Sequence, residues 1–115
     1  MNEKVYDLKE RTFKFAQRML DIVEQLPKRS QCDNIRTQLA KAGTSIGANV
    51  EEVDGTLTKK DFVSKMVIAR KEAKETRYWL RLVSGRYIKS EEVAPDIKKA
   101  QELLKILSSI INKSR

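Results

Sequence analysis

Between residues 62 and 83, apolar or small residues recur at every third or fourth position. This spacing constrains the fold more than any other feature of the chain. The steps alternate four and three without a break, at Phe62, Met66, Ala69, Ala73, Thr76, Leu80 and Val83. Such spacing places these side chains in one stripe along a single face of an α-helix. We therefore predict a long helix with one buried face, which other helices must cover.

Three further segments have the same helical period. The first helix is predicted over residues 5–26, where Pro27 ends it, and the second after the short turn 27–30, with Ser30 or Asp33 as its cap. The last is predicted to start at Ser90 or Ala94. The stripe positions are Leu8, Phe15, Ala16, Met19, Ile22, Val23 and Leu26, then Ile35, Leu39, Ala42, Ile46, Val50 and Val53, then Val93, Ile97, Ala100, Leu104, Leu107 and Ile111. Connections of about 4–8 residues make consecutive helices antiparallel. The prediction is an all-α, antiparallel up-down-up-down four-helix bundle, a single domain over residues 1–115.

Composition narrows the function classes. The chain of 115 residues has no histidine and one cysteine, Cys32, so it lacks the residues for an internal disulfide, most zinc sites, and Ser-His-Asp or Cys-His catalysis. We expect a protein that is not an enzyme and that uses no metal or cofactor. No run of 18 apolar residues occurs and the N-terminus has no apolar signal region, so we expect a cytoplasmic protein without a membrane partner.

Positive charge is concentrated in residues 59–86, which hold nine Lys or Arg and three Asp or Glu, against a net charge of +8 for the chain. Arg70, Lys74, Arg77 and Arg81 are spaced 4, 3 and 4 apart, and Lys71 lies beside them. On a helix these cations form one narrow stripe about 16 Å long, roughly 100° around from the buried stripe. Guanidinium groups suit phosphate geometry, so the stripe is a candidate nucleic-acid site. The alternatives are a solvated face or a salt-bridged seam with another subunit or a partner protein.

A second stripe on the same predicted helix is a candidate oligomer interface. It consists of Ile68, Glu72, Glu75, Trp79 and Leu82, also spaced 4-3-4-3. A helix with two such stripes has two packing partners, and one bundle core supplies only one. Glu72 and Glu75 could instead form a carboxylate pair for acid-base chemistry or a metal, but pairing with cations of an adjacent helix is the simpler interpretation.

Gly43 and Gly47 stand four apart in the middle of the second predicted helix, where each costs about 1 kcal/mol relative to alanine. We expect a close approach of another helix to offset that cost. Ser45 and Asn49, beside them, are expected to be buried and to fix helix register through hydrogen bonds. Cys32 is expected in or beside a loop, as an incidental thiol.

Two stretches of the chain carry motifs of a known family. Residues 39–52 contain Thr44-Ser45-Ile46, Ala48-Asn49-Val50 and Glu52, and residues 61–80 contain Phe62, Ile68-Ala69 and Glu75. On these residues the chain resembles, over nearly its whole length, the four-helix-bundle proteins encoded in 23S rRNA intervening sequences. It departs from the family pattern at Val53, where glycine is frequent, and at Glu72, where serine is frequent.

Proteins of this kind are similar to the accessory variability proteins of diversity-generating retroelements, which are pentameric bundles that bind nucleic acid and a reverse transcriptase. The resemblance implies a homopentamer with RNA or DNA, and a partner protein, as possible partners. It implies no established biochemical activity, because the function of the intervening-sequence proteins is itself largely unassigned.

Overall fold

Four helices and one short 3-10 segment make up the computed structural model, which describes the backbone of residues 3–115 and the side chains of residues 7–115. In chain order the elements are α1 (Glu3–Gln25), α2 (Ser30–Glu51), η1 (Glu52–Gly55), α3 (Lys59–Val83) and α4 (Ser90–Ser114). The predicted all-α class and the four helices are confirmed.

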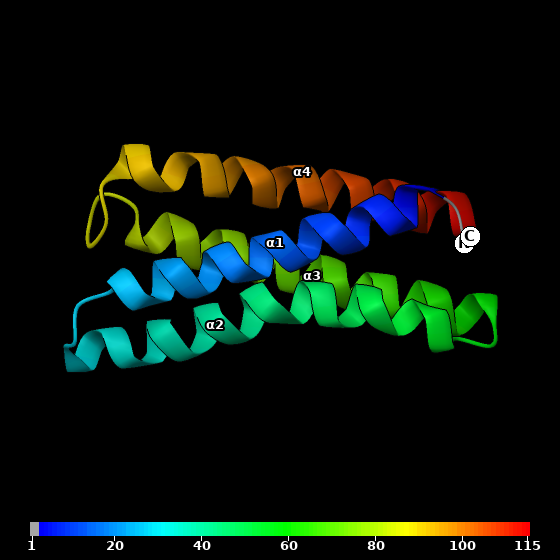
Figure 1. Ribbon diagram of the computed structural model, residues 1–115, viewed down its shortest axis with the longest axis horizontal. Helices are drawn as coiled ribbons and strands as arrows, with labels where there is room; N and C mark the ends of the chain where they lie inside the picture. Colours follow the sequence, from blue (N-terminus) through cyan, green and yellow to red (C-terminus); the bar gives the residue numbers. More distant parts are fainter. Residues whose placement is uncertain (1–2) are drawn as a thin grey trace.

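Consecutive helices run antiparallel and lie side by side, so the order around the bundle is α1, α2, α3, α4 (Figure 1). The bundle measures 45 × 24 × 19 Å, and the start of α1 lies at the same end as the end of α4. The backbones of α1 and α2, of α2 and α3, and of α3 and α4 approach closely, whereas α1 and α4 lie farther apart. Long side chains bridge that last seam.

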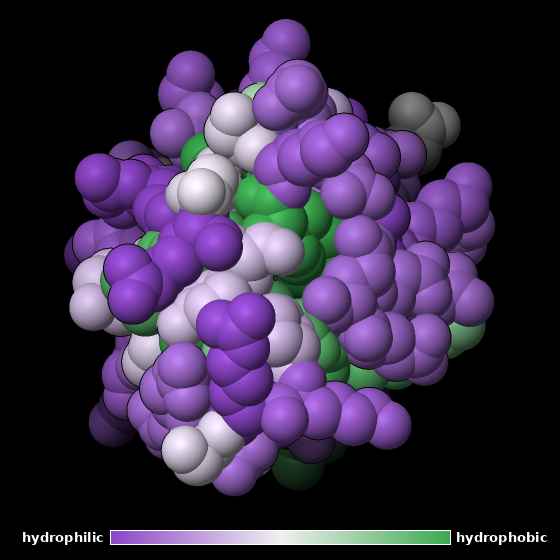
Figure 2. Space-filling view, turned by 90° about the vertical axis from the view of Figure 1, so that its left-hand side faces the viewer, coloured by the Kyte–Doolittle hydropathy of each residue, from purple (hydrophilic) through white to green (hydrophobic). Residues whose placement is uncertain are grey.

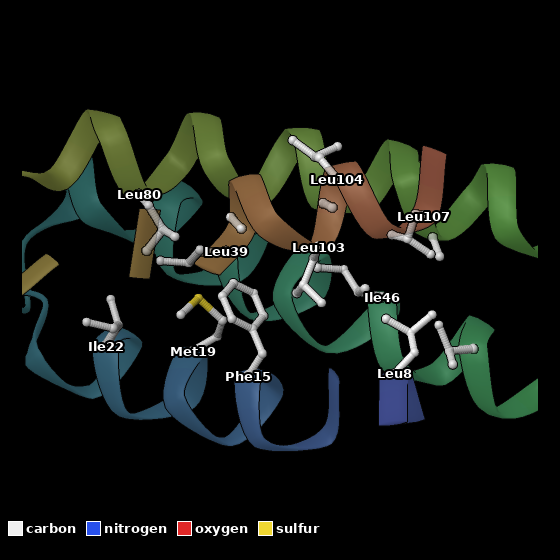
Figure 3. Close-up of a cluster of buried hydrophobic side chains, with 14 of the residues drawn as sticks. Leu8, Phe15, Met19, Ile22, Leu39, Ile46, Leu80, Leu103, Leu104 and Leu107 are labelled. Carbon is white, nitrogen blue, oxygen red and sulfur yellow. The ribbon is translucent and has the colours of Figure 1, made fainter. Parts of the chain in front are cut away.

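The core lies where the four helical stripes meet, and Figure 3 shows side chains of all four helices converging there. The predicted stripe of α3 is buried from Met66 to Val83, and Phe62 is half-buried. Of the other predicted positions, only Ala16, Val23 and Ile97 are half-buried instead of buried. The structure adds buried residues that the period did not mark, among them Thr12, Cys32, Asp96, Leu103 and Ile110. Cys32 lies in the first turn of α2, beside the α1–α2 turn as expected, and its side chain is fully buried.

Local signals fix both ends of α3, whereas the predicted cap of α2 is absent. The Thr58 side chain caps α3, accepting a hydrogen bond from the backbone N–H of Asp61 at 3.0 Å. Gly85 follows α3 with φ of 77°, a conformation that suits glycine, and turns the chain toward α4. The expected cap of α2 by Ser30 or Asp33 is wrong: Ser30 is already helical, and Arg29 precedes the helix without a side-chain cap.

Helix α2 approaches α1 closely at its glycines, as predicted. A Cβ atom added to Gly43 would lie 2.7 Å from Cβ of Met19, and one added to Gly47 would lie 3.3 Å from the backbone oxygen of Thr12. The expected role of Ser45 and Asn49 is not confirmed. Both are half-buried, and each donates to a carbonyl of its own helix, Ser45 to Lys41 and Asn49 to Ser45.

Hydrophilic side chains dominate the end of the bundle that carries the α1–α2 turn and the α3–α4 loop, around a small apolar centre (Figure 2). Over the described residues, every helix is too short or too polar to cross a bilayer.

Candidate nucleic-acid interface

The predicted basic stripe lies along the side of α3 that faces away from α2. Lys71, Lys74 and Arg81 are exposed, while Arg70 and Arg77 are half-buried. None of these five cations forms an ion pair with any side chain in residues 7–115. The stripe therefore carries charge that the described part of one chain does not neutralise.

The carboxylates in the middle of helix α4, the neighbour of this stripe, pair with α1 and not with α3. Between Ala94 and Asn112 its acidic residues are Asp96 and Glu102. Asp96 accepts hydrogen bonds from Nε and Nη2 of Arg18 on α1, at 3.0 and 3.1 Å, and Glu102 lies 4.0 Å from the guanidinium of Arg11 on the same helix. Both acidic groups thus belong to the α1–α4 seam, away from α3.

The acidic residues in the middle of α3 lie on its α2 side. Burial raises the pKa of Glu72 above its usual value, and the neighbouring Glu75 raises it further, while Lys71 and Lys41 of α2 oppose the shift. Closer to the start of α3, Lys65 pairs with Glu52 of η1 at 2.5 Å. Because negative charge collects at the α2 side of α3 and at the α1 side of α4, the cations of the stripe other than Lys71 have no carboxylate partner among the described residues.

The predicted oligomer stripe is only partly available at the surface. Ile68 and Leu82 are 39% and 40% exposed, and Glu75 is also exposed. Trp79 is half-buried and packs against the core, so it contributes to the fold of a single chain as well. The exposed ring of Tyr78 meets the Trp79 ring edge-on, with centroids 5.1 Å apart.

Sequence reasoning did not identify the ion pair of Arg18 with Asp96. The Asp96 side chain is 4% exposed and the Arg18 side chain is 34% exposed. The hydrogen bonds to the Asp96 carboxylate raise the pKa of Arg18. The only signal in the sequence is an acidic residue one step before a stripe position, Ile97. The sequence position of Asp96 can be interpreted only when it is known that α1 packs against the side of α4 that carries this residue.

Within the described side chains, the structure contains no cluster of three or more acidic, cysteine or histidine residues that could hold a metal ion. The Lys and Arg side chains of the stripe suit the binding of phosphate oxygens.

Comparison with known proteins places the fold and the motifs in one family. The model of the 23S rRNA-intervening sequence proteins matches residues 4–109. The chain belongs to the 23S rRNA-intervening sequence protein family. A crystal structure of a protein of unknown function from the S23 ribosomal protein family of Bacteroides thetaiotaomicron is similar, with a TM-score of 0.86 and 34% identity. The match covers 95% of this intervening-sequence family chain and 98% of that protein. No match was found among curated proteins.

Proposed function

We propose that this protein is a self-associating, non-enzymatic bundle that binds RNA or DNA through Arg70, Lys71, Lys74, Arg77 and Arg81 of α3. The observation that carries the proposal is that all five cations are without an ion-pair partner in residues 7–115. Like-charged neighbours on one helix repel each other, and an anionic partner removes that cost. A nucleic-acid backbone supplies regularly spaced phosphates along the stripe.

Self-association through the stripe of Ile68, Glu72, Glu75, Trp79 and Leu82 would strengthen such binding. The stripe lies toward α2 and the cations lie toward α4, so one surface of α3 serves assembly while the other stays open. The resemblance to the accessory variability proteins implies a homopentamer. Five copies of a chain with net charge +8 would form a strongly cationic ring.

Fluorescence anisotropy of labelled RNA and DNA across a salt series tests the proposal, with nuclease-treated protein. We expect binding to persist near physiological salt, with a log-log slope that indicates several released counterions. Arg77→Ala and Arg81→Ala should each reduce that slope by about 1. The matched control replaces Lys28 and Arg29 in the α1–α2 turn by alanine, which removes two exposed cations that belong to neither α3 nor α4.

Two results would contradict nucleic-acid binding by α3. One is binding that disappears well below physiological salt, and the other is a slope that changes as much in the control as in the α3 variants. If charge reversal at Arg70 or Arg77 instead dissociates the assembly, the cations seal a subunit or partner interface, and the protein is an interaction scaffold.

A further inference from the structure

We propose that the surface formed by α3 and α4 binds double-stranded nucleic acid, holding phosphates of both strands. This inference rests on the proposed function and adds a second row of contacts, Lys98 and Lys105 of α4. Both side chains are exposed, and neither forms an ion pair with a described residue.

Burial fixes the direction of these lysines. Two residues along a helix correspond to a rotation of about 200°, so a residue two positions before a buried one points away from the core. Lys98 precedes the buried Ala100 in this way, and Lys105 precedes the buried Leu107. On α3 the same relation holds for Lys74 before Thr76 and for Arg81 before Val83, and all four cations are exposed. Each helix therefore presents an outward row of cations.

The spacing of the two rows suits a duplex. Lys98 and Lys105 stand two helical turns apart, about 10 Å, and packed helices have axes about 8–10 Å apart. The two strands that border a groove of a duplex are separated by a similar distance, about 6–12 Å. One strand can follow the row on α3 while the other follows the row on α4. A lone strand would use one row and leave the other without phosphates.

The aromatic content of the surface also favours a duplex. Proteins that hold single strands offer a series of aromatic rings on which unpaired bases stack. Between Met66 and Val83 the aromatic residues are Tyr78 and Trp79, and these pack edge-on against each other, with Trp79 half-buried in its own chain. No such series of platforms follows the described cations, so phosphates are the groups that this surface is built to contact.

The test compares duplex RNA and duplex DNA with unstructured single strands of equal length, by anisotropy near physiological salt. The variants are Lys98→Ala with Lys105→Ala, Arg77→Ala alone, and the Lys28→Ala with Arg29→Ala control. We expect one or both duplexes to bind more tightly than the single strands. The α4 double variant should weaken duplex binding about 10- to 30-fold and lower its log-log slope by about 2, while affecting single strands less. Whichever duplex binds more tightly, RNA or DNA, identifies the nucleic acid that supplies the phosphates.

Two outcomes would overturn the duplex proposal alone. In one, single strands bind as tightly as duplexes while Arg77→Ala still weakens binding, and in the other the α4 double variant binds duplex like the control. In both cases the α3 site stands. If neither duplex nor single strand binds, both this proposal and the proposed function fail. Circular dichroism of each variant verifies that the helices are retained.

Discussion

At the scale of single residues, Gly43 is important because it has no side chain. Gly43 lies where α2 touches α1, and a Cβ atom there would overlap Cβ and Cγ of Met19 at 2.7 and 2.6 Å. The outer atoms of the Met19 side chain can move easily, but its Cβ is fixed to the backbone of α1. Any larger residue at this position must therefore push the two helices apart.

We predict that Gly43→Ala destabilises the fold by about 1–3 kcal/mol, because overpacking outweighs the gain in helix propensity. Urea unfolding followed by circular dichroism measures the change. The matched control is Gly55→Ala, where the added Cβ meets nothing within 4 Å and φ is not positive. That variant should be neutral or slightly more stable. Equal effects at the two positions would contradict the close approach.

Glu72 is the residue whose protonation should affect stability. Because burial and Glu75 raise its pKa above the ordinary value of 4.5, the folded state binds this proton more tightly than the unfolded state does. Its contribution to the free energy of unfolding therefore falls as pH rises from the ordinary value through the raised value. Above that interval the charged carboxylate carries a penalty, and below pH 4.5 the penalty is absent.

The corresponding variant is Glu72→Gln, which we expect to be more stable than the parent at neutral pH. The side chain is only half-buried, so solvent screening limits the gain to less than about 1 kcal/mol. The gain should disappear in unfolding experiments below pH 4. Glu24→Gln, on the exposed side of α1, serves as the control. A gain that is independent of pH would show that charge at Glu72 is not its cause.

At the scale of the elements, α1 and α4 are joined differently from the other neighbouring pairs. The three close pairs are held by apolar stripes, whereas this seam contains the ion pairs of Arg18 with Asp96 and Arg11 with Glu102. The first is bidentate, and its carboxylate is almost fully buried. Removing the arginine alone would leave that carboxylate desolvated and without a counterion.

We predict that Arg18→Ala destabilises the protein by about 2–4 kcal/mol, toward the lower end because the arginine itself is one-third exposed. The double variant with Asp96→Ala should recover part of this loss, since it removes the stranded charge. Lys14→Ala on the same helix is the control, because both side chains of the Lys14–Glu10 pair are exposed. This variant should change stability by less than about 0.5 kcal/mol. Strict additivity of Arg18→Ala and Asp96→Ala would argue against coupling of the pair.

At the scale of the whole molecule, the two stripes of α3 lie on opposite flanks of the helix, and the proposed function assigns a different task to each. Ile68 and Leu82 remain about 40% exposed on the α2 side, while the unneutralised cations lie on the α4 side. If assembly uses the first flank and nucleic acid the second, substitutions on one should leave the other intact. A scaffold that seals its interface with cations would instead couple the two.

We expect Ile68→Asp combined with Leu82→Asp to reduce the mass in sedimentation equilibrium toward that of a single chain, with helical content unchanged. Burying the introduced carboxylates at a subunit contact is costly. Leu57→Asp is the matched control, because Leu57 is 93% exposed in the connection before α3 and lies outside both stripes. Retention of the parent mass by the double variant would exclude this stripe as the subunit contact.

The sequence alone was sufficient for the four helices, most of the buried positions and the close approach of α2 to α1 at its glycines. These features depend on short-range geometry, since 3.6 residues per turn determines which side chains share a face. The charge partners depended on the tertiary structure. Whether Asp96 neutralises α3 or Arg18, and whether Glu72 lies toward α2 or α4, depends on which helices flank each face. Periodicity gives the direction of a side chain on its own helix, and only packing decides which charges meet it.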